Sequence, residues 1–592
     1  MNHVRAIWGT VVVGIFAIPL LLGLGRWDMR SDEAIYSYAV ERILETGDWL
    51  TPRNIPTDTP FLEKPPLKFW LVAGGMSAGL LPVDETGMRL LDALFGVAAF
   101  AYIFAFGLRL AGPVAGIAAL FVLLAFNPLV FEHGLRSNNM EAALFLSYCG
   151  GLFHFLRWRD PSATRRRAHA AAVGLYFALG FLTKFVAVAF LPLVALAWLV
   201  CSRAGRQHLV GHWKDWLLPT AICVVLIAPW FVYEWAQYRD EFWTIIFGAH
   251  VYTRFTASLD PSHVHPWHYY FTQTWHELFL GHVALLVTAG VGLLAWEAWK
   301  GTSLARLLLL WWLLPTTLIS FGTSKLPHYA YPFFPPLALG AGLVVARLAG
   351  LATRAAARVD WQALAPRPLT RPLASRLLLI IAVACLGLSA WSFVSGEPAR
   401  LYWGDVQLFR NGSIGRPLLI ALVLLIVTNR VSRYVSVIIT IAIIALCAPV
   451  DAYSRATTIA LRYDRPMSAI THCLLRLQDR GTLTRSGMFI ADWTIVTHPP
   501  YFYFRHLGPW QAGDDDWLPT LVARMEQEAP AIVGTREAPR VLAALTAAGI
   551  PPPSTMELEP GVLLLLPGTY ARCTQTGLSY GGAPFEWTSV TR

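Results

Sequence analysis

The stretch Arg30-Ser31-Asp32-Glu33-Ala34-Ile35-Tyr36 lies between the first apolar segment of the chain, 11–24, and the next long one, which begins near residue 90. A second polar stretch, Phe61-Leu62-Glu63-Lys64-Pro65-Pro66-Leu67-Lys68, follows about thirty residues later in the same linker. An acidic linker between two apolar segments predicts a loop at a membrane surface, and much of the remaining chain would hold it there.

The composition is that of a polytopic membrane protein. Of the 592 residues, 55% are hydrophobic and only 14% are charged, and the mean hydropathy is +0.49. Soluble domains carry about 25% charged residues, so this chain has too few to solvate its apolar surface. The net charge of +10 does not indicate a nucleic-acid partner, because the Arg clusters lie in short loops between apolar segments. We therefore expect membrane lipids, and no nucleic acid, as partners.

Hydropathy predicts a mainly α-helical transmembrane bundle of about thirteen spans. Several segments are shorter than the roughly 20 residues that a full crossing needs, so their boundaries are approximate. The predicted spans are 6–24, 88–111, 113–131, 139–157, 169–183, 185–201, 215–235, 278–299, 304–322, 329–349, 376–394, 412–428 and 434–450.

Arg and Lys concentrate in alternate loops of this pattern. These loops fall at 157–167, 203–214, 300–306, 354–371 and 430–433. By the positive-inside rule they face the cytoplasm. The loops 25–87, 132–140, 236–277 and 323–328, and the tail after Val450, would then face the opposite side.

The first outer loop, 25–87, predicts two helices that lie along the membrane surface. Ser31 is a suitable cap for a helix that runs to Thr46, and Gly47 is a suitable end. Its apolar side chains recur every four residues on one face, as in an interfacial helix. After the helix-breaking prolines 65 and 66, an apolar segment at 67–81 predicts a second interfacial helix.

The sequence divides at residue 454 into a transmembrane domain, 1–454, and a small soluble α/β domain, 455–592. In the tail, helical periodicity predicts helices at 468–478, 518–527 and 538–548, and short apolar runs predict strands at 487–492, 531–534 and 562–566. Cys473 and Cys573 both lie in this tail, where an oxidising compartment would allow them to form a disulfide.

Several polar motifs resemble those of one enzyme family. Asp32-Glu33-Ala34-x-Tyr36, Gly47-Asp48-Trp49 and Glu63-Lys64-Pro65-Pro66-Leu67 resemble the first-loop signature of the GT-C glycosyltransferases, in the aminoarabinose transferase and protein O-mannosyltransferase branch. Arg136-x4-Glu141, Leu182-Thr183-Lys184 and Ser324-Lys325-Leu326-Pro327-His328-Tyr329 resemble later motifs of this branch in the same order. The last of them is similar to the aminoarabinose transferases in particular.

The resemblance implies a fold of GT-C type and an inverting transfer of a sugar from a polyprenyl-phosphate donor. The acceptor would be a lipid, glycan or protein of the bacterial envelope, on the periplasmic face of the cytoplasmic membrane. Ile35 replaces the Arg that is common in the Asp-Glu-x-Arg-Tyr motif of the aminoarabinose subgroup, so the sequence does not fix the sugar.

The resemblance also assigns roles to individual residues. Catalysis would fall to Asp32, Glu63, Lys64 and Glu141, with Asp32 orienting or deprotonating an acceptor hydroxyl. If the acceptor is itself a phosphate, Asp32 would only position it or stabilise charge. Glu141 stands where the family usually has Asp and would support the reaction electrostatically. The donor phosphate and lipid would be bound by Lys64, Lys184, Arg254, Lys325 and Tyr329.

A divalent metal is a further implication. The stretch Ala249-His250-Val251-Tyr252-Thr253-Arg254-Phe255 resembles the His-x3-Arg-Phe element of the family, and by this match His250 would join Glu63 on zinc or magnesium. The alternative is that the histidines of the 236–277 loop accompany an interfacial aromatic belt and bind no metal.

Two other functions remain open. The chain is alternatively a transporter or flippase of polyprenyl-linked lipids, or a catalytically inactive membrane scaffold. Transporters place polar groups at the membrane midplane in broken helices and often have paired halves. Here the acids gather in outward loops and the spans are unrepeated, which favours the enzyme.

Overall fold

The structure is a computed structural model of the whole chain. It describes residues 2–30, 32–55, 57–257, 261–358, 372–395, 399–404, 406–411, 417, 420–421, 423–424, 451–462, 464–479, 487–491, 498–508, 510–513, 516–568, 570 and 573. Ser31, the predicted helix cap, and the predicted span 434–450 lie outside the described residues, as does most of the span 412–428.

Apolar helices dominate the described chain, as predicted. Five helical segments are long and apolar enough to cross a membrane by length and composition: Glu85–Ala111, Arg166–Val188, Trp213–Thr256, Ser303–Ser320 and Pro335–Arg354. Other helices occupy further predicted spans, among them α1 (Asn2–Leu21), α5 (Pro113–Ala125), α7 (Glu141–Arg159), α9 (Phe190–Val200), α14 (Ala284–Trp299) and α17 (Pro372–Ser395). The mainly helical architecture is confirmed, whereas the number of about thirteen spans stays a prediction.

The chain forms two compact units, each built from separate segments. The first unit comprises Met1–Leu22, Phe61–Lys68 and Leu91–Leu461, and the second comprises Gly23–Pro60, Phe69–Leu90 and Arg462–Arg592. The predicted first outer loop is thus divided between them. The predicted boundary at 454/455 stays a prediction.

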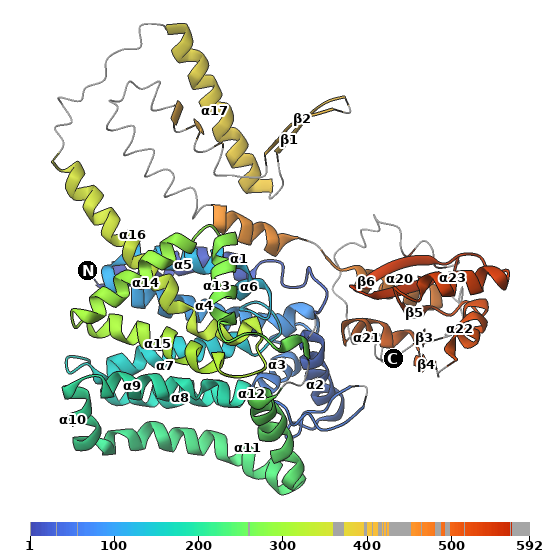
Figure 1. Cartoon of the computed structure of the whole chain (residues 1–592), viewed down its shortest axis with the longest axis horizontal. Coiled ribbons are helices and arrows are strands. Elements are labelled where there is room, and N and C mark those ends of the chain that lie inside the picture. Colours follow the sequence, from blue (N-terminus) through green and yellow to red (C-terminus); the bar gives the residue numbers. More distant parts are fainter. Residues whose placement is uncertain are drawn as a thin grey trace. The chain divides into compact units, whose positions relative to one another are not determined.

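In the first unit, helices that are close in sequence pack side by side. Helix α8 (Arg166–Lys184) contacts both α7 and α11 (Leu217–Trp243), and α14 contacts α16 (Pro335–Ala356) (Figure 1). Helices α14 and α16 approach so closely that a Cβ on Gly290 would lie 2.3 Å from the carbonyl carbon of Gly340. Small residues permit this approach, as they do between membrane helices.

The segment 236–277 differs from the predicted loop at its start. Helix α11 ends at Trp243, and a π-helical stretch, η3 (Thr244–Thr253), and α12 (Arg254–Thr256) continue it. Arg239, with a φ of +47°, kinks α11, but the sequence between Pro229 and Gly248 holds no Pro or Gly and the helix resumes after the kink. His250 and Arg254 are therefore carried on helical backbone.

The second unit contains helix α2 (Asp32–Thr46) and most of α3 (Leu67–Ser77), the two helices that the first loop predicted. Gly47 follows α2 with a φ of +72°, in the left-handed region where glycine is favoured, so the predicted helix end is confirmed. Whether these helices lie in the membrane interface stays a prediction.

The tail in the second unit is an α/β fold around a five-stranded sheet, with the strand order β4-β3-β5-β7-β6. Strand β3 (Met488–Ile490) is parallel to β4 (Trp510–Ala512) and β5 (Ala531–Gly534), and β7 (Val562–Leu566) is antiparallel to β5 and β6 (Ser554–Glu559). Helices α22 (Trp517–Glu526) and α23 (Ala538–Ala547) bury Leu521 and Leu545 against the sheet (Figure 1). A disulfide joins Cys573 to Cys473 of α20 (Pro466–Asp479), with the two Cα atoms 5.7 Å apart.

Candidate active site

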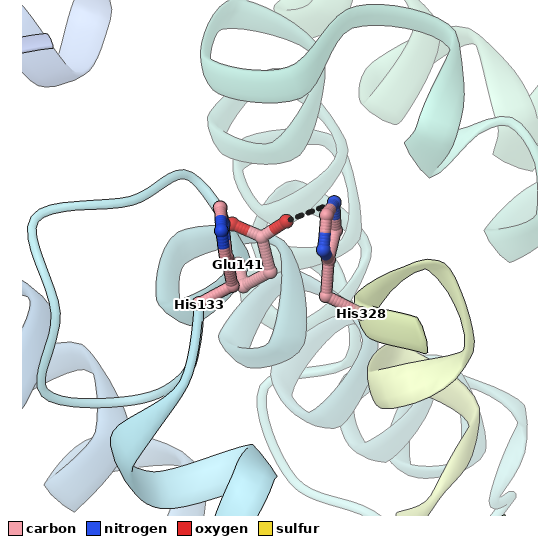
Figure 2. A group of neighbouring side chains, drawn as sticks. All are labelled: His133, Glu141 and His328. Carbon is pink, nitrogen blue, oxygen red and sulfur yellow. Dashed lines mark ion pairs between the residues drawn. The ribbon is translucent and has the colours of Figure 1, made fainter. Parts of the chain in front are cut away.

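A buried carboxylate, Glu141, is the centre of the charged cluster in the first unit. Its side chain is 4% exposed and forms an ion pair with Lys184, whose Nζ donates to its Oε1. The Nε2 atom of His328 lies 3.5 Å from the same oxygen. Figure 2 shows a second histidine, His133, beside Glu141 and His328. The predicted residues Glu141 and Lys184 are therefore in direct contact.

Helix ends bring this pair together. Glu141 is in the first turn of α7, and Lys184 is the last residue of α8, the next long helix, which packs against α7. A carboxylate at a helix N-terminus and an ammonium at a C-terminus both complement the helix dipole. The same end of this helix pair thus presents two opposite charges.

His133 is held in an unusual backbone conformation beside Glu141. Its φ is +45°, which lies in the left-handed region that residues other than glycine rarely adopt. The following residue, Gly134, has no room for a side chain, because a Cβ there would lie 1.9 Å from the carbonyl oxygen of Leu129. The ring of His133 stacks on that of His328 with centroids 4.5 Å apart. Burial lowers the pKa of His328 well below its ordinary range, although the charge of Glu141 opposes this shift.

Arg254 and Tyr329, both predicted donor-binding residues, are in contact. The Arg254 guanidinium donates to the Tyr329 hydroxyl, and the Lys184 ammonium lies 5.4 Å from the centre of the Tyr329 ring. Two backbone hydrogen bonds hold the segments together: the Ser324 N–H donates to the Arg254 carbonyl at 3.0 Å and the Thr323 N–H donates to the Phe255 carbonyl at 3.0 Å. Three of the predicted phosphate-binding groups therefore gather near Glu141.

Lys325 has a different environment from the one expected of a ligand-binding cation. It is only 3% exposed, and its Nζ donates to the carbonyl oxygens of His265 and Gly322, the first at 2.8 Å. These bonds fix the 323–328 turn against the segment around residue 265. The role of Lys325 in binding phosphate stays a prediction.

The predicted metal ligands Glu63 and His250 also meet. Their Oε2 and Nε2 atoms are 3.4 Å apart. Desolvation raises the pKa of Glu63, but the hydrogen bond with His250 and the positive charges of Lys64 and Arg254 outweigh it and bring the pKa to about 2. Catalytic zinc sites use three protein ligands. Within the described part of the chain, no third His, Cys, Asp or Glu completes this pair. The pair alone is therefore an incomplete zinc site.

Asp32 lies in the second unit, half-buried in the first turn of α2. The segment before it is fixed by Arg89, a residue that the motifs did not single out. The Arg89 guanidinium forms two hydrogen bonds of 2.7 Å with the Glu33 carboxylate and one of 2.7 Å with the Leu24 carbonyl. The backbone on both sides of Asp32 is thereby held in place. Its predicted sharing of a pocket with Glu63, Lys64 and Glu141 stays a prediction.

A cavity with acidic groups in its wall opens in the first unit. Its lining includes Phe126, Glu132, Tyr270, Gln273, Glu277 and Tyr331. Burial, and next the charge of Glu132, raise the pKa of Glu277. Glu132 is adjacent in sequence to His133, so the cavity and the Glu141 cluster share a chain segment. The sequence alone did not indicate this cavity, because its two carboxylates come from segments more than a hundred residues apart.

Known proteins share sequence with the chain. Residues 63–233 match the family model described as dolichyl-phosphate-mannose-protein mannosyltransferase. An undecaprenyl phosphate-alpha-4-amino-4-deoxy-L-arabinose arabinosyl transferase from Pectobacterium carotovorum is 29% identical over 64% of this chain and 65% of its own. Another, from Pseudomonas fluorescens, is 27% identical over 70% of this chain and 74% of its own. The chain thus matches just under two thirds of the length of the first relative.

Solved structures share the fold. The crystal structure of ArnT from Cupriavidus metallidurans bound to undecaprenyl phosphate aligns with 97% of this chain and 100% of its own, with a TM-score of 0.58 and 17% identity. The chain thus has the same fold as this protein. Its predicted resemblance to the aminoarabinose transferases is confirmed. Archaeal oligosaccharyltransferase AglB from Archaeoglobus fulgidus aligns with 94% of this chain and 74% of its own, with a TM-score of 0.50 and 13% identity.

The family match covers part of the candidate site. Glu63, Lys64, Glu141 and Lys184 lie within residues 63–233. Asp32, His250, Arg254, Lys325 and Tyr329 lie outside that range.

Proposed function

We propose that this chain is an integral membrane glycosyltransferase of the GT-C superfamily. It moves a sugar from a polyprenyl-phosphate donor to an envelope acceptor, with inversion at the anomeric carbon. The reaction takes place on the periplasmic face of the bacterial cytoplasmic membrane. The disulfide between Cys473 and Cys573 supports this orientation, because disulfides persist in oxidising compartments such as the periplasm.

The observation that carries the proposal is the group of cations around Glu141. Displacement at an anomeric carbon leaves a negatively charged lipid phosphate, which needs positioned cations and hydrogen-bond donors. Lys184 and Arg254 supply the charge, and Tyr329, which accepts from Arg254, keeps a hydroxyl near them. Glu141 neutralises Lys184 before the donor arrives and favours the positive charge that develops on the sugar.

The remaining assignments follow the family resemblance. Lys64 also contacts the donor phosphate, and Glu63, which contacts His250, belongs to the catalytic group. Asp32 orients or deprotonates the acceptor. The acceptor is a lipid A-like lipid, a glycan or a protein.

The acidic cavity supports a donor sugar that carries an amine. A protonated amine would be stabilised by the carboxylates of Glu132 and Glu277, whereas a neutral hexose would leave both without a countercharge. The relatives from Pectobacterium carotovorum and Pseudomonas fluorescens are named for a 4-amino sugar. An amino sugar is therefore the donor group that we favour.

The proposal is tested by Asp32→Asn in purified full-length protein, reconstituted in nanodiscs with a polyprenyl-phosphate amino sugar and an envelope lipid extract. General base catalysis contributes about 10²–10⁴-fold, so we expect kcat to fall by at least about a hundredfold for a hydroxyl acceptor. Glu45→Gln is the matched control, because Glu45 is an exposed acid on the same helix. Transfer at the wild-type rate by the Asn variant contradicts the role of Asp32. Donor movement across a bilayer without transfer by the wild type favours a flippase.

A further inference from the structure

We infer that His133, Glu141 and His328 form a binding site for a divalent metal ion, with zinc as the preferred ion. One ligand atom from each of the three side chains lies within 4.8 Å of the other two. Figure 2 shows the three side chains grouped together, with the Glu141 carboxylate directed toward His328. This site differs from the predicted pair of Glu63 and His250, which holds two ligands only.

The donor set suits zinc. Two imidazole nitrogens and one carboxylate oxygen are a ligand set that catalytic zinc sites use, with a fourth position left for water or a substrate. The three ligands come from separate segments: the turn after α6 (Asn127–Phe131), the first turn of α7, and η5 (Pro327–Phe333). Magnesium prefers an all-oxygen shell, so two histidines disfavour it.

The backbone conformation of His133 supports a role as a metal ligand, because a ligand side chain must point in one fixed direction. Left-handed backbone at a residue other than glycine is unfavourable and tends to occur at functional sites. At His133 this backbone conformation is combined with ring stacking: the centroid of the His328 ring lies 4.5 Å from that of the His133 ring. Zinc–nitrogen bonds are about 2.0–2.1 Å long, so two nitrogens bound to one ion lie at most about 4.2 Å apart. The 4.8 Å limit on the three ligand atoms is close to this separation, so at most small side-chain rotations are needed for an ion to bind.

Lys184 affects metal binding at this site, because its ammonium already donates a hydrogen bond to one carboxylate oxygen of Glu141. A dication and an ammonium compete for the same carboxylate and repel each other. Metal binding would thus release Lys184 from Glu141, and removal of the ammonium would tighten metal binding. If the proposed function is right, the released Lys184 becomes available to the donor phosphate.

A second group in the described chain has the same donor types and must be excluded from the measurement. His208, His212 and Asp215 also place one ligand atom each within 4.8 Å of one another. His208 belongs to α10 (Arg203–Gly211), and it accepts a hydrogen bond from Arg159 at Nε2. Every protein in the test, including the reference, therefore carries His212→Ala.

The experiment is a zinc titration of full-length protein in nanodiscs, stripped with a chelator and monitored by competition with a chromogenic chelator. The reference protein should bind one zinc ion. Loss of an outer-shell partner already costs about 10–100-fold in metal affinity, so His133→Ala and His328→Ala should each weaken binding by at least about tenfold. Lys184→Met should tighten it by at least about threefold. His276→Ala, on α13 (Tyr269–Leu280), is the matched control and should bind zinc like the reference.

Three results would overturn the inference. They are no zinc binding by the reference, reference affinity in both His133→Ala and His328→Ala, and loss of zinc only in His250→Ala. Thermal unfolding of each variant without zinc verifies that it is folded, and His328→Gln replaces His328→Ala if the latter is not. Zinc binding is read without a sugar donor, so failure here leaves the proposed transferase activity standing, and failure of that activity leaves the metal site standing.

Discussion

At the scale of single residues, the first unit buries complete ion pairs. Lys68 and Asp92 form one with an Nζ–Oδ2 distance of 2.7 Å, and their side chains are 1% and 0% exposed. The Lys68 ammonium also donates to the Asn139 carbonyl, in the turn that leads to Glu141. Charges buried this deeply are stable only as a pair, because either one alone lacks both water and a countercharge.

We predict that Lys68→Met destabilises the protein by about 3–5 kcal/mol, the usual cost of removing one partner of a buried pair. Adding Asp92→Asn should restore much of this loss, because the isolated carboxylate is then gone. Thermal unfolding of the purified variants measures both effects. If the single and double variants unfold at the same temperature, the pair does not carry the stability assigned to it.

Local motifs predicted part of the candidate site. Glu141 and Lys184 were both named from sequence motifs, and so were Glu63 and His250, and the structure brings each pair together. The contribution of His133 was not predictable, because its partner His328 is almost two hundred residues away and no spacing rule relates them. Lys325 was named as a phosphate ligand, but motif matching cannot reveal that its ammonium is directed at backbone carbonyls.

At the scale of elements, Asp28 of the first loop caps a helix of the tail within the second unit. The Asp28 carboxylate accepts from the backbone N–H groups of Met467 at 2.8 Å and Ser468 at 3.3 Å, at the start of α20. Burial, and next the charge of Glu85, raise the pKa of Asp28 to about 7, while Arg465 and the two amides oppose the shift. The cap therefore titrates near neutral pH.

This titration predicts a pH dependence of stability. An unfolded Asp has a pKa of about 3.9, so between about pH 4 and pH 7 the folded state binds the extra proton. Stability then falls as the pH rises through this window. We expect the unfolding temperature of the wild type to decrease from pH 5 to pH 7 more steeply than that of Asp28→Asn. Parallel pH profiles for the two proteins would contradict this.

Elements with strong local patterns were predicted well. The strands at 531–534 and 562–566 are confirmed at their predicted ends, and the helices at 518–527 and 538–548 are confirmed to within one residue. Helix α21 (His498–Phe504) was missed, because its two prolines were not read as the first turn of a helix, where proline is tolerated. Strand β6 was not predicted because its alternation is short: only Met556 and Leu558 are apolar, and its other four residues are polar.

At the scale of the whole molecule, hydropathy predicted helices but not how chain segments are grouped. The first loop was expected to act as one piece, yet residues 23–60 belong to the same unit as the tail, and residues 61–68 belong to the other. Hydropathy is a local quantity, whereas this grouping depends on contacts such as that of Asp28 with α20, more than four hundred residues apart. The overall fold nevertheless agrees with the GT-C resemblance.

The most direct test of the central claim, sugar transfer to the envelope, is mass spectrometry of envelope lipids and glycans. Cells that produce the wild-type chain are compared with cells that lack it and with cells that produce Asp32→Asn. We predict that an envelope species bearing an added amino sugar is present only with the wild type. A neutral hexose in its place would contradict the amino-sugar assignment alone. If no envelope species changes in mass, the glycosyltransferase account is contradicted.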